Sequence, residues 1–311
     1  MRKMQHKTEV VKNVLISIFI SLFSITALAQ QTNFLIDLDS VAEEYSVSHF
    51  SLSTRDIYGT NDSVYLFNVM PKYIENPREN PEFAKDRIKY LFMFAIFPTL
   101  NSDKQWTTYE KFPHNINILS FKQLLADGPS NIELKNKPKM PDRYGILIKK
   151  GQKYYKSNIS YMQTFYLNNY PSAFNVPANV ININQQIISI KDMEKIYETN
   201  YKGRDLPIFP NVSFQGFDNI GLERFYLSRK SRIKNMDAYQ FWTFKPRYEV
   251  SHGESWEQGI DRFIYIPDKG IVGGSFDFYF YYHRQKLGMT TLDFKNNIKQ
   301  EKLMLAEQYK H

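Results

Sequence analysis

The chain has 311 residues, of which 24 are Phe, 22 are Tyr and none is cysteine, and its formal net charge is +8. Without cysteine no disulfide bond can cross-link the chain, so its stability must come from a hydrophobic core. The aromatic residues supply apolar surface for such a core. The length suits one large domain or two small ones.

The first 29 residues have the three parts of a secretory signal peptide. Val14 to Ile25 is an apolar run broken only by serines, and Ala27-Leu28-Ala29 fits the small-x-small pattern before a cleavage site. The run is shorter than the roughly 20 residues that span a bilayer, so an uncleaved anchor is the weaker alternative. We expect residues 1–29 to be a signal peptide, with the periplasmic or secreted chain beginning near Gln30. The basic residues of this segment are Arg2, Lys3, Lys7 and Lys12.

The exported chain keeps only a mild excess of positive charge, because part of the excess belongs to the signal peptide. In an exported protein this charge indicates an envelope protein or an anionic glycan as the partner, and no nucleic acid. An ordinary solvated surface is the alternative. No later stretch is long and apolar enough to span a membrane.

The first hundred residues predict mainly strands. Phe34 to Leu38 and Val64 to Val69 are short strand candidates, and Pro81 to about Lys89 is a short helix candidate. Tyr90 to Phe97 has no polar residue apart from the tyrosine hydroxyl, which fits either a buried helix or a central strand. We favour a strand that pairs with Trp106 to Tyr109, because a proline ends the run.

The middle of the chain is punctuated by turn signals. Ser120 to Asp127 predicts a short helix, and the loop from Pro129 to Pro141, with three prolines, is where an internal domain boundary would fall. Tyr144 to Lys149 and Gln152 to Lys156 predict a hairpin. Val180 to Ile190 alternates like a strand, and a helix is expected to follow over residues 192–199.

Ile220 to Ile233 is interpreted as a basic helix, and Tyr239 to Val250 as a strand. The strongest local signal is a hairpin in which Phe263 to Ile266 pairs with Ser275 to Tyr282 across the turn Pro267-Asp268-Lys269-Gly270. Alternation then places the side chains of Phe276, Phe278, Phe280 and Tyr282 on one face, which we expect to be core.

Gly273-Gly274 predicts a bulge in this hairpin or a close backbone approach. A final helix is expected from Phe294 to about Glu307. The fold class is therefore α+β, mainly antiparallel sheet with several short helices and a C-terminal helix. Residues 30–311 are expected to form a single domain, with 129–141 as the possible internal boundary.

Residues 252–261 contain the best candidates for catalysis. Glu254, Glu257 and His252 could supply, in that order, the acid, base and orienting groups of a hydrolase acting on an envelope polymer, with Asp261 close in sequence. The alternative is that the two glutamates favour a helix N-terminus for structural reasons.

A second candidate is a run of basic and aromatic residues that could bind an anionic partner. A solvated surface, or a core strand for the aromatic part, is the alternative. The candidate binding residues are Arg224, Arg229, Lys230, Arg232, Trp242 and Trp256.

The sequence has no glycine-rich phosphate loop, no Gly-x-Ser-x-Gly elbow, no His-Glu-x-x-His and no calcium-loop spacing. We therefore expect no metal and no cofactor. The favoured hypothesis is a non-catalytic binding protein, and the hydrolase with His252, Glu254 and Glu257 is the alternative.

Overall fold

The computed structural model describes residues 32–37, 45–72, 89–100, 105–113, 117–120, 144–168, 180–202, 206, 208, 224–244 and 259–310. The expected signal peptide and the loop 129–141 lie outside these residues. So do residues 81–88 of the first predicted helix and residues 121–127 of the second.

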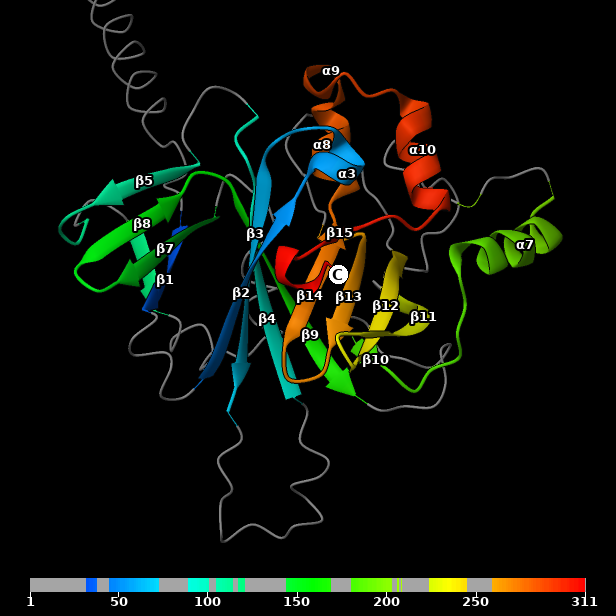
Figure 1. Cartoon of the computed structure of the whole chain (residues 1–311), viewed down its shortest axis with the longest axis horizontal. Coiled ribbons are helices and arrows are strands. Elements are labelled where there is room, and N and C mark those ends of the chain that lie inside the picture. The colour runs from blue at the N-terminus through cyan, green and yellow to red at the C-terminus, as the bar shows by residue number, and fades with distance from the viewer. Residues whose placement is uncertain are drawn as a thin grey trace, which may run out of the picture.

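The described strands form three sheets of five, which lie side by side in Figure 1. Sheet A has the order β5 (Trp106–Tyr109), β8 (Lys153–Ser157), β7 (Tyr144–Lys150), β1 (Thr32–Asp37) and β6 (Asn117–Ser120). Sheet B has the order β10 (Val180–Asn182), β9 (Ser160–Asn168), β4 (Lys89–Ile96), β3 (Ser63–Pro71) and β2 (Tyr45–Ser53). Sheet C has the order β11 (Arg224–Ile233), β12 (Met236–Phe244), β13 (Arg262–Ile266), β14 (Gly270–Ser275) and β15 (Met304–Leu305).

Most strand pairs are antiparallel, and β1 with β6, β1 with β7, and β9 with β10 are parallel. The described helices are few and short: α3 (Arg55–Tyr58), α7 (Ile190–Asn200), α8 (Asp277–Tyr282), α9 (Arg284–Leu287), α10 (Thr291–Lys299) and the 3₁₀ turn Glu307–Tyr309. The class is thus mostly β, so the α+β prediction is confirmed in part, including its antiparallel sheets and a helix near the C-terminal end.

Sheet B is central because both of its faces are covered. Leu91, Met93 and Ala95 of β4 belong to the core shared with sheet C. The alternate residues Phe92, Phe94 and Ile96 belong to a second cluster, which also contains Ile146 and Ile148 of sheet A. A strand buried on both faces has no position for a polar side chain, which explains the unbroken apolar run and confirms the prediction of a strand there.

Several other sequence predictions are confirmed, and others need correction. The strands near 34–38 and 64–69 and the hairpin β7–β8 are present, and α7 begins with a capping box between Ser189 and Asp192. Trp106 to Tyr109 forms a strand, but it pairs with β8 in sheet A instead of β4. The strand predicted over 180–190 ends at Asn182. The final helix, predicted to reach about Glu307, ends at Lys299, and Met304–Leu305 is a strand.

The basic segment 224–233 is a strand, so the helix predicted there is wrong. Its apolar residues are buried on both sides of the strand. The ring of Phe225 lies 5.3 Å from that of Phe263, and the ring of Tyr226 stacks on Trp242 at 4.8 Å. Phe225 and Tyr226 are adjacent in the sequence but contact partners on opposite faces of the sheet. This alternation is that of a strand and not of a helix.

The hairpin β13–β14 is present, but the second strand ends at Ser275, and residues 277–282 form helix α8. Phe276, Phe278 and Phe280 are buried as expected, but Phe276 precedes helix α8, Phe278 and Phe280 lie on it, and Tyr282 is only partly buried. β13 has five residues, and they pair with Gly270 to Ser275. The following backbone therefore has no strand to pair with and forms its hydrogen bonds locally.

The predicted bulge and the predicted close approach both occur near the two glycines of β14. The register shifts between Ile264 and Tyr265, which leaves Val272 unpaired beside Gly273. A Cβ on Gly273 would lie 2.5 Å from the carbonyl oxygen of Met304 in β15. β15 thus covers the edge of sheet C, and the adjacent bridge between Leu52 and Ala306 joins this segment to sheet B.

Candidate functional site

The outer part of the hairpin β11–β12 presents a group of basic side chains to solvent. The strands are joined by Lys234 and Asn235, whose φ angles of 48° and 65° are typical of a tight two-residue hairpin turn. Arg229, Lys230, Arg232 and Lys234 are exposed, whereas Asp237 is the only acidic residue of the hairpin from 229 to 237. We call these four basic residues the hairpin cluster.

β11 is the edge strand of sheet C, and its two halves differ. Along the inner half, the segment before α7 covers the edge: the amide of Ile188 donates to the Leu227 carbonyl at 2.8 Å. Beside it, Nε2 of Gln185 donates to the Phe225 carbonyl at 3.0 Å. Along the outer half, from Arg229 to Ile233, none of the described residues forms a strand pair on this side.

Two residues of the hairpin cluster, Lys230 and Arg232, are two positions apart and share one face of the strand. Lys230 lies opposite Tyr239, and its Nζ is 6.0 Å from the ring centre, within the range of a cation–π contact. Arg232 lies opposite Asp237, with 3.4 Å between Nε and a carboxylate oxygen. Both interactions are exposed to solvent, so they hold the side chains only weakly. The cations remain available to an anionic partner.

The structure separates two of the other predicted binding residues, Arg224 and Trp242, from this cluster. Arg224 begins β11 and is eight residues from Arg232, about 26 Å along a strand. Trp242 lies in the core, and its Nε1 donates to the Ile188 carbonyl at 2.8 Å. Trp256 lies outside the described residues. Lys234 ends the same basic run in the sequence but was not among the candidate binding residues.

The candidate catalytic residues His252, Glu254 and Glu257 also lie outside the described residues. Asp261, next to them in sequence, is buried at the start of β13, where its amide donates to the Ser275 carbonyl at 2.8 Å. Over the described ranges no three His, Asp or Glu side chains come together as metal ligands could. None of the helices in those ranges is long and apolar enough to cross a membrane.

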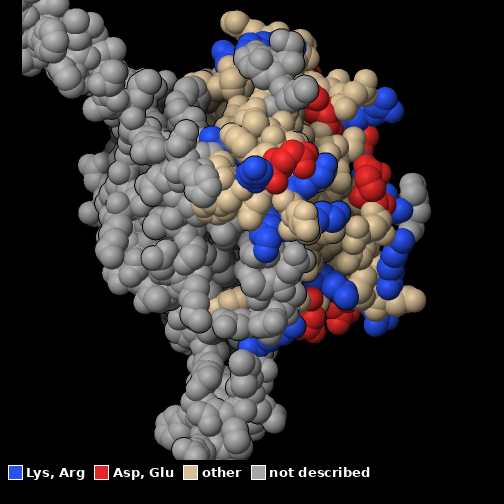
Figure 2. Space-filling view, turned by 90° about the vertical axis from the view of Figure 1, so that its left-hand side faces the viewer, with Lys and Arg blue, Asp and Glu red and all other residues tan. Residues whose placement is uncertain are grey.

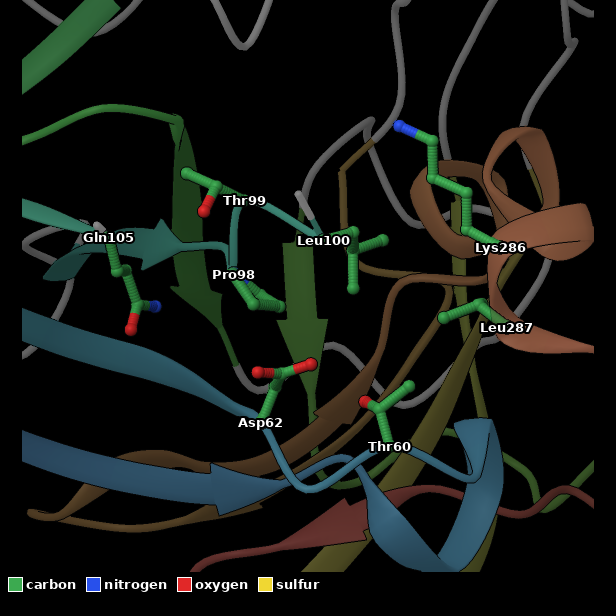
Figure 3. A pocket seen from close by; sticks show the side chains of 8 residues that line it. All are labelled: Thr60, Asp62, Pro98, Thr99, Leu100, Gln105, Lys286 and Leu287. Atoms are coloured by element: carbon green, nitrogen blue, oxygen red, sulfur yellow. The ribbon is translucent and has the colours of Figure 1, made fainter. Parts of the chain in front are cut away.

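A pocket of about 390 Å³ lies between the turn before β3, the end of β4 and α9. Thr60 and Asp62 lie across it from Thr99 and Leu100 (Figure 3). The fold already uses much of its polar lining, because Thr60 bonds to Thr54 and Nε2 of Gln105 donates to the Ser63 carbonyl at 3.1 Å.

One charged group of the pocket acts on a buried neighbour. Burial and, to a smaller extent, the Asp62 carboxylate raise the pKa of Tyr279, whose hydroxyl donates to the Pro98 carbonyl at 2.6 Å. This keeps Tyr279 a neutral donor. The pocket is lined by one carboxylate, Asp62, and one ammonium group, Lys286, which lie on opposite sides of it in Figure 3, so no acid and base converge there.

The most buried polar cluster joins Arg262 of β13 to Asp277 of α8. Their side chains are 2% and 0% exposed and form a bidentate ion pair, with 3.1 Å between Nη2 and Oδ1. Tyr58 donates to Asp277 at 3.0 Å and accepts from the amide of Phe276 at 2.8 Å. Nε of Arg262 donates to the Lys302 carbonyl at 2.8 Å. Because the partners enclose one another, this cluster fixes α8 on sheet C and is closed to a ligand.

The face of the molecule on the side of sheet A carries interspersed basic and acidic side chains among its described residues (Figure 2). In this view the described residues form no large area of one charge. Comparison with protein-family models, curated proteins and solved structures found no match to this chain.

Proposed function

We propose that this chain is an exported, non-catalytic binding protein that recognises an acidic partner protein through the hairpin cluster. The single observation that carries the proposal is the grouping of Arg229, Lys230, Arg232 and Lys234 on one exposed hairpin with only Asp237 to oppose them. Export is inferred from the tripartite pattern of residues 1–29.

The hairpin is better suited to binding than to chemistry. Its side chains are cationic and solvated, and charges of this kind steer an oppositely charged partner and set specificity. A glycan could use the same charges, but a protein segment could also use the open backbone edge of β11. For this reason we favour an acidic protein segment over an anionic glycan.

Fluorescence anisotropy with the exported chain, residues 30–311, tests the proposal. The probes are a peptide of alternating glutamate and threonine, a sulfated polysaccharide and the neutral polymer dextran. The test variant combines Arg229→Glu, Lys230→Glu and Arg232→Glu. The control combines Lys191→Glu, Lys195→Glu and Lys202→Glu, which makes the same change of charge at exposed positions in and after α7.

We expect the acidic peptide to bind, and the hairpin variant to weaken this binding about tenfold or more, since three lost ion pairs readily exceed 1.4 kcal/mol. The control variant should bind within about twofold of the original chain, and added salt should weaken binding. Binding of the polysaccharide alone would refute the protein partner. Equal losses for both variants would refute the hairpin as the site.

A further inference from the structure

We propose that an extended acidic segment of the partner adds to the outer half of β11 as an antiparallel strand, next to Lys230 and Arg232. This inference rests on the proposed function and specifies how the hairpin cluster would recognise its ligand. It follows from the register of the hairpin, from the way the chain itself uses the same edge, and from the charge of that edge.

The hairpin register shows which backbone groups face outward. Ile233 pairs with Met236 across a two-residue turn, and such a closing pair is a hydrogen-bonded pair. Alternation then makes 231 with 238 the next hydrogen-bonded pair, so the N–H and C=O groups of Lys230 and Arg232 point away from β12. These are the groups that an added strand would use.

The inner half of the same edge already accepts backbone from another segment. The amide of Ile188 donates to the Leu227 carbonyl, and the side chain of Gln185 takes the place of a further strand bond at Phe225. The register shift between Leu227 and Arg229 separates this covered half from the outer half. An added strand is therefore limited to about five residues, or roughly 16 Å.

Charge selects the kind of strand that fits. In antiparallel addition, the residues opposite Lys230 and Arg232 have their side chains on the same face as these cations, and acidic residues there would form cross-strand ion pairs. A second copy of this chain would place cations opposite cations, which disfavours self-pairing at the edge. The orientation is taken as antiparallel because every pair within sheet C is antiparallel.

Selective backbone N-methylation of the alternating glutamate–threonine peptide tests the geometry without changing its charge. One peptide is N-methylated at the glutamates, whose amides would bond to β11. The matched peptide is N-methylated at the threonines, whose amides would point to solvent. Both are compared with the unmethylated peptide by anisotropy on the chain of residues 30–311.

We expect glutamate N-methylation to weaken binding about tenfold or more, because it blocks the bonds to Lys230 and Arg232. Threonine N-methylation should change binding less than about threefold. Any other pattern overturns strand addition. If both methylated peptides bind like the unmethylated one, the cluster recognises charge alone and the proposed function stands. If the unmethylated peptide does not bind, the proposed function fails as well.

Discussion

The side chain of Asn68 in β3 hydrogen bonds twice to the backbone of Ile271 in β14, with both distances at 2.9 Å. Nδ2 donates to the Ile271 carbonyl, and Oδ1 accepts from the Ile271 amide. The buried carboxamide thereby completes the backbone bonding of a strand in the neighbouring sheet. The contact also requires glycine at 270, because a Cβ there would lie 2.7 Å from Cγ of Asn68.

Asn68→Ala should lower the free energy of unfolding by about 2 kcal/mol or more, because it leaves a buried donor and a buried acceptor without partners. Asn296→Ala, at an exposed position of α10, is the control and should have little effect. Urea denaturation followed by circular dichroism measures both. Similar midpoints for the two variants would contradict the role of Asn68.

Asp277→Asn should destabilise the fold by about 3 to 5 kcal/mol, since it leaves the buried guanidinium of Arg262 without its counter-charge. The matched change Asp237→Asn removes the partner of Arg232 at an exposed pair and should scarcely alter the urea midpoint. If both variants unfolded at the same urea concentration, the ion pair of Arg262 with Asp277 would not stabilise the fold.

Stability should fall as the pH rises above about 10. Burial, followed by the charge of Asp277, raises the pKa of Tyr58 well above its usual value near 10, and burial raises the pKa of Tyr265 to about 12. Above pH 10 the unfolded chain loses these protons and the folded chain keeps them, so the unfolded state gains relative stability. The stability that these two protonated tyrosines contribute is fully present below pH 10. It is lost as the pH rises through their pKa values in the folded state.

Urea midpoints measured between pH 8 and pH 11.5 would show this decline, and absorbance at 295 nm would report tyrosine ionisation. Tyr265→Phe should make the decline shallower, because one of the protected protons is removed. An unchanged slope in that variant would contradict the assignment to Tyr265.

Gly273→Ala should destabilise the protein by about 1 to 3 kcal/mol, because its Cβ would meet the backbone of β15, which cannot move independently. Gly274→Ala is the informative comparison. Its Cβ would lie 2.3 Å from Cδ1 of Ile260 and 3.3 Å from the carbonyl oxygen of Arg262, so the closest clash is with a side chain and the loss should be smaller. Thermal unfolding measures the loss of stability in both variants. A larger loss for Gly274→Ala than for Gly273→Ala would show that β15 is not closely packed on Gly273.

Export predicts a cleavage after Ala29. N-terminal sequencing of the protein recovered from the producing cell should find Gln30 first. Replacing Ala27 and Ala29 by arginine should leave the segment attached, because the cleavage site requires small residues. Intact Met1 on the soluble cytoplasmic protein would refute export.

The sequence predicted best those elements whose cause is local. Turn chemistry alone identifies the hairpin that turns at Gly151-Gln152 and the hairpin that turns at 267–270. Tyr90 to Phe97 was predicted as a strand from its apolar run and the proline that follows. What the run did not show is that two different sheets cover its two faces, since that depends on distant segments.

The wrong predictions concern segments whose structure depends on pairing with another part of the chain. Residues 277–282 have a strand-like pattern, and they become a helix because β13 has no further residues for them to pair with. The basic run was recognised as a candidate binding segment, whereas its strand structure was not, because neither Lys234 nor Asn235 is a glycine. Arg262 and Asp277 were not recognised as partners, since sequence spacing does not reveal a pair that meets across a strand and a helix.

The position of β15 has a consequence for the time course of folding. Its residues cover β14, Ala306 bridges to Leu52, and Lys310 donates to Asp56 at 3.1 Å, so segments about 250 positions apart must meet. Contacts of such long range require a large loop to close before they gain any energy, and they slow the search for the native state. We therefore infer that these contacts form late in folding, and that the part of the seam between sheets B and C made by residues 304–310 closes only after those residues have left the ribosome.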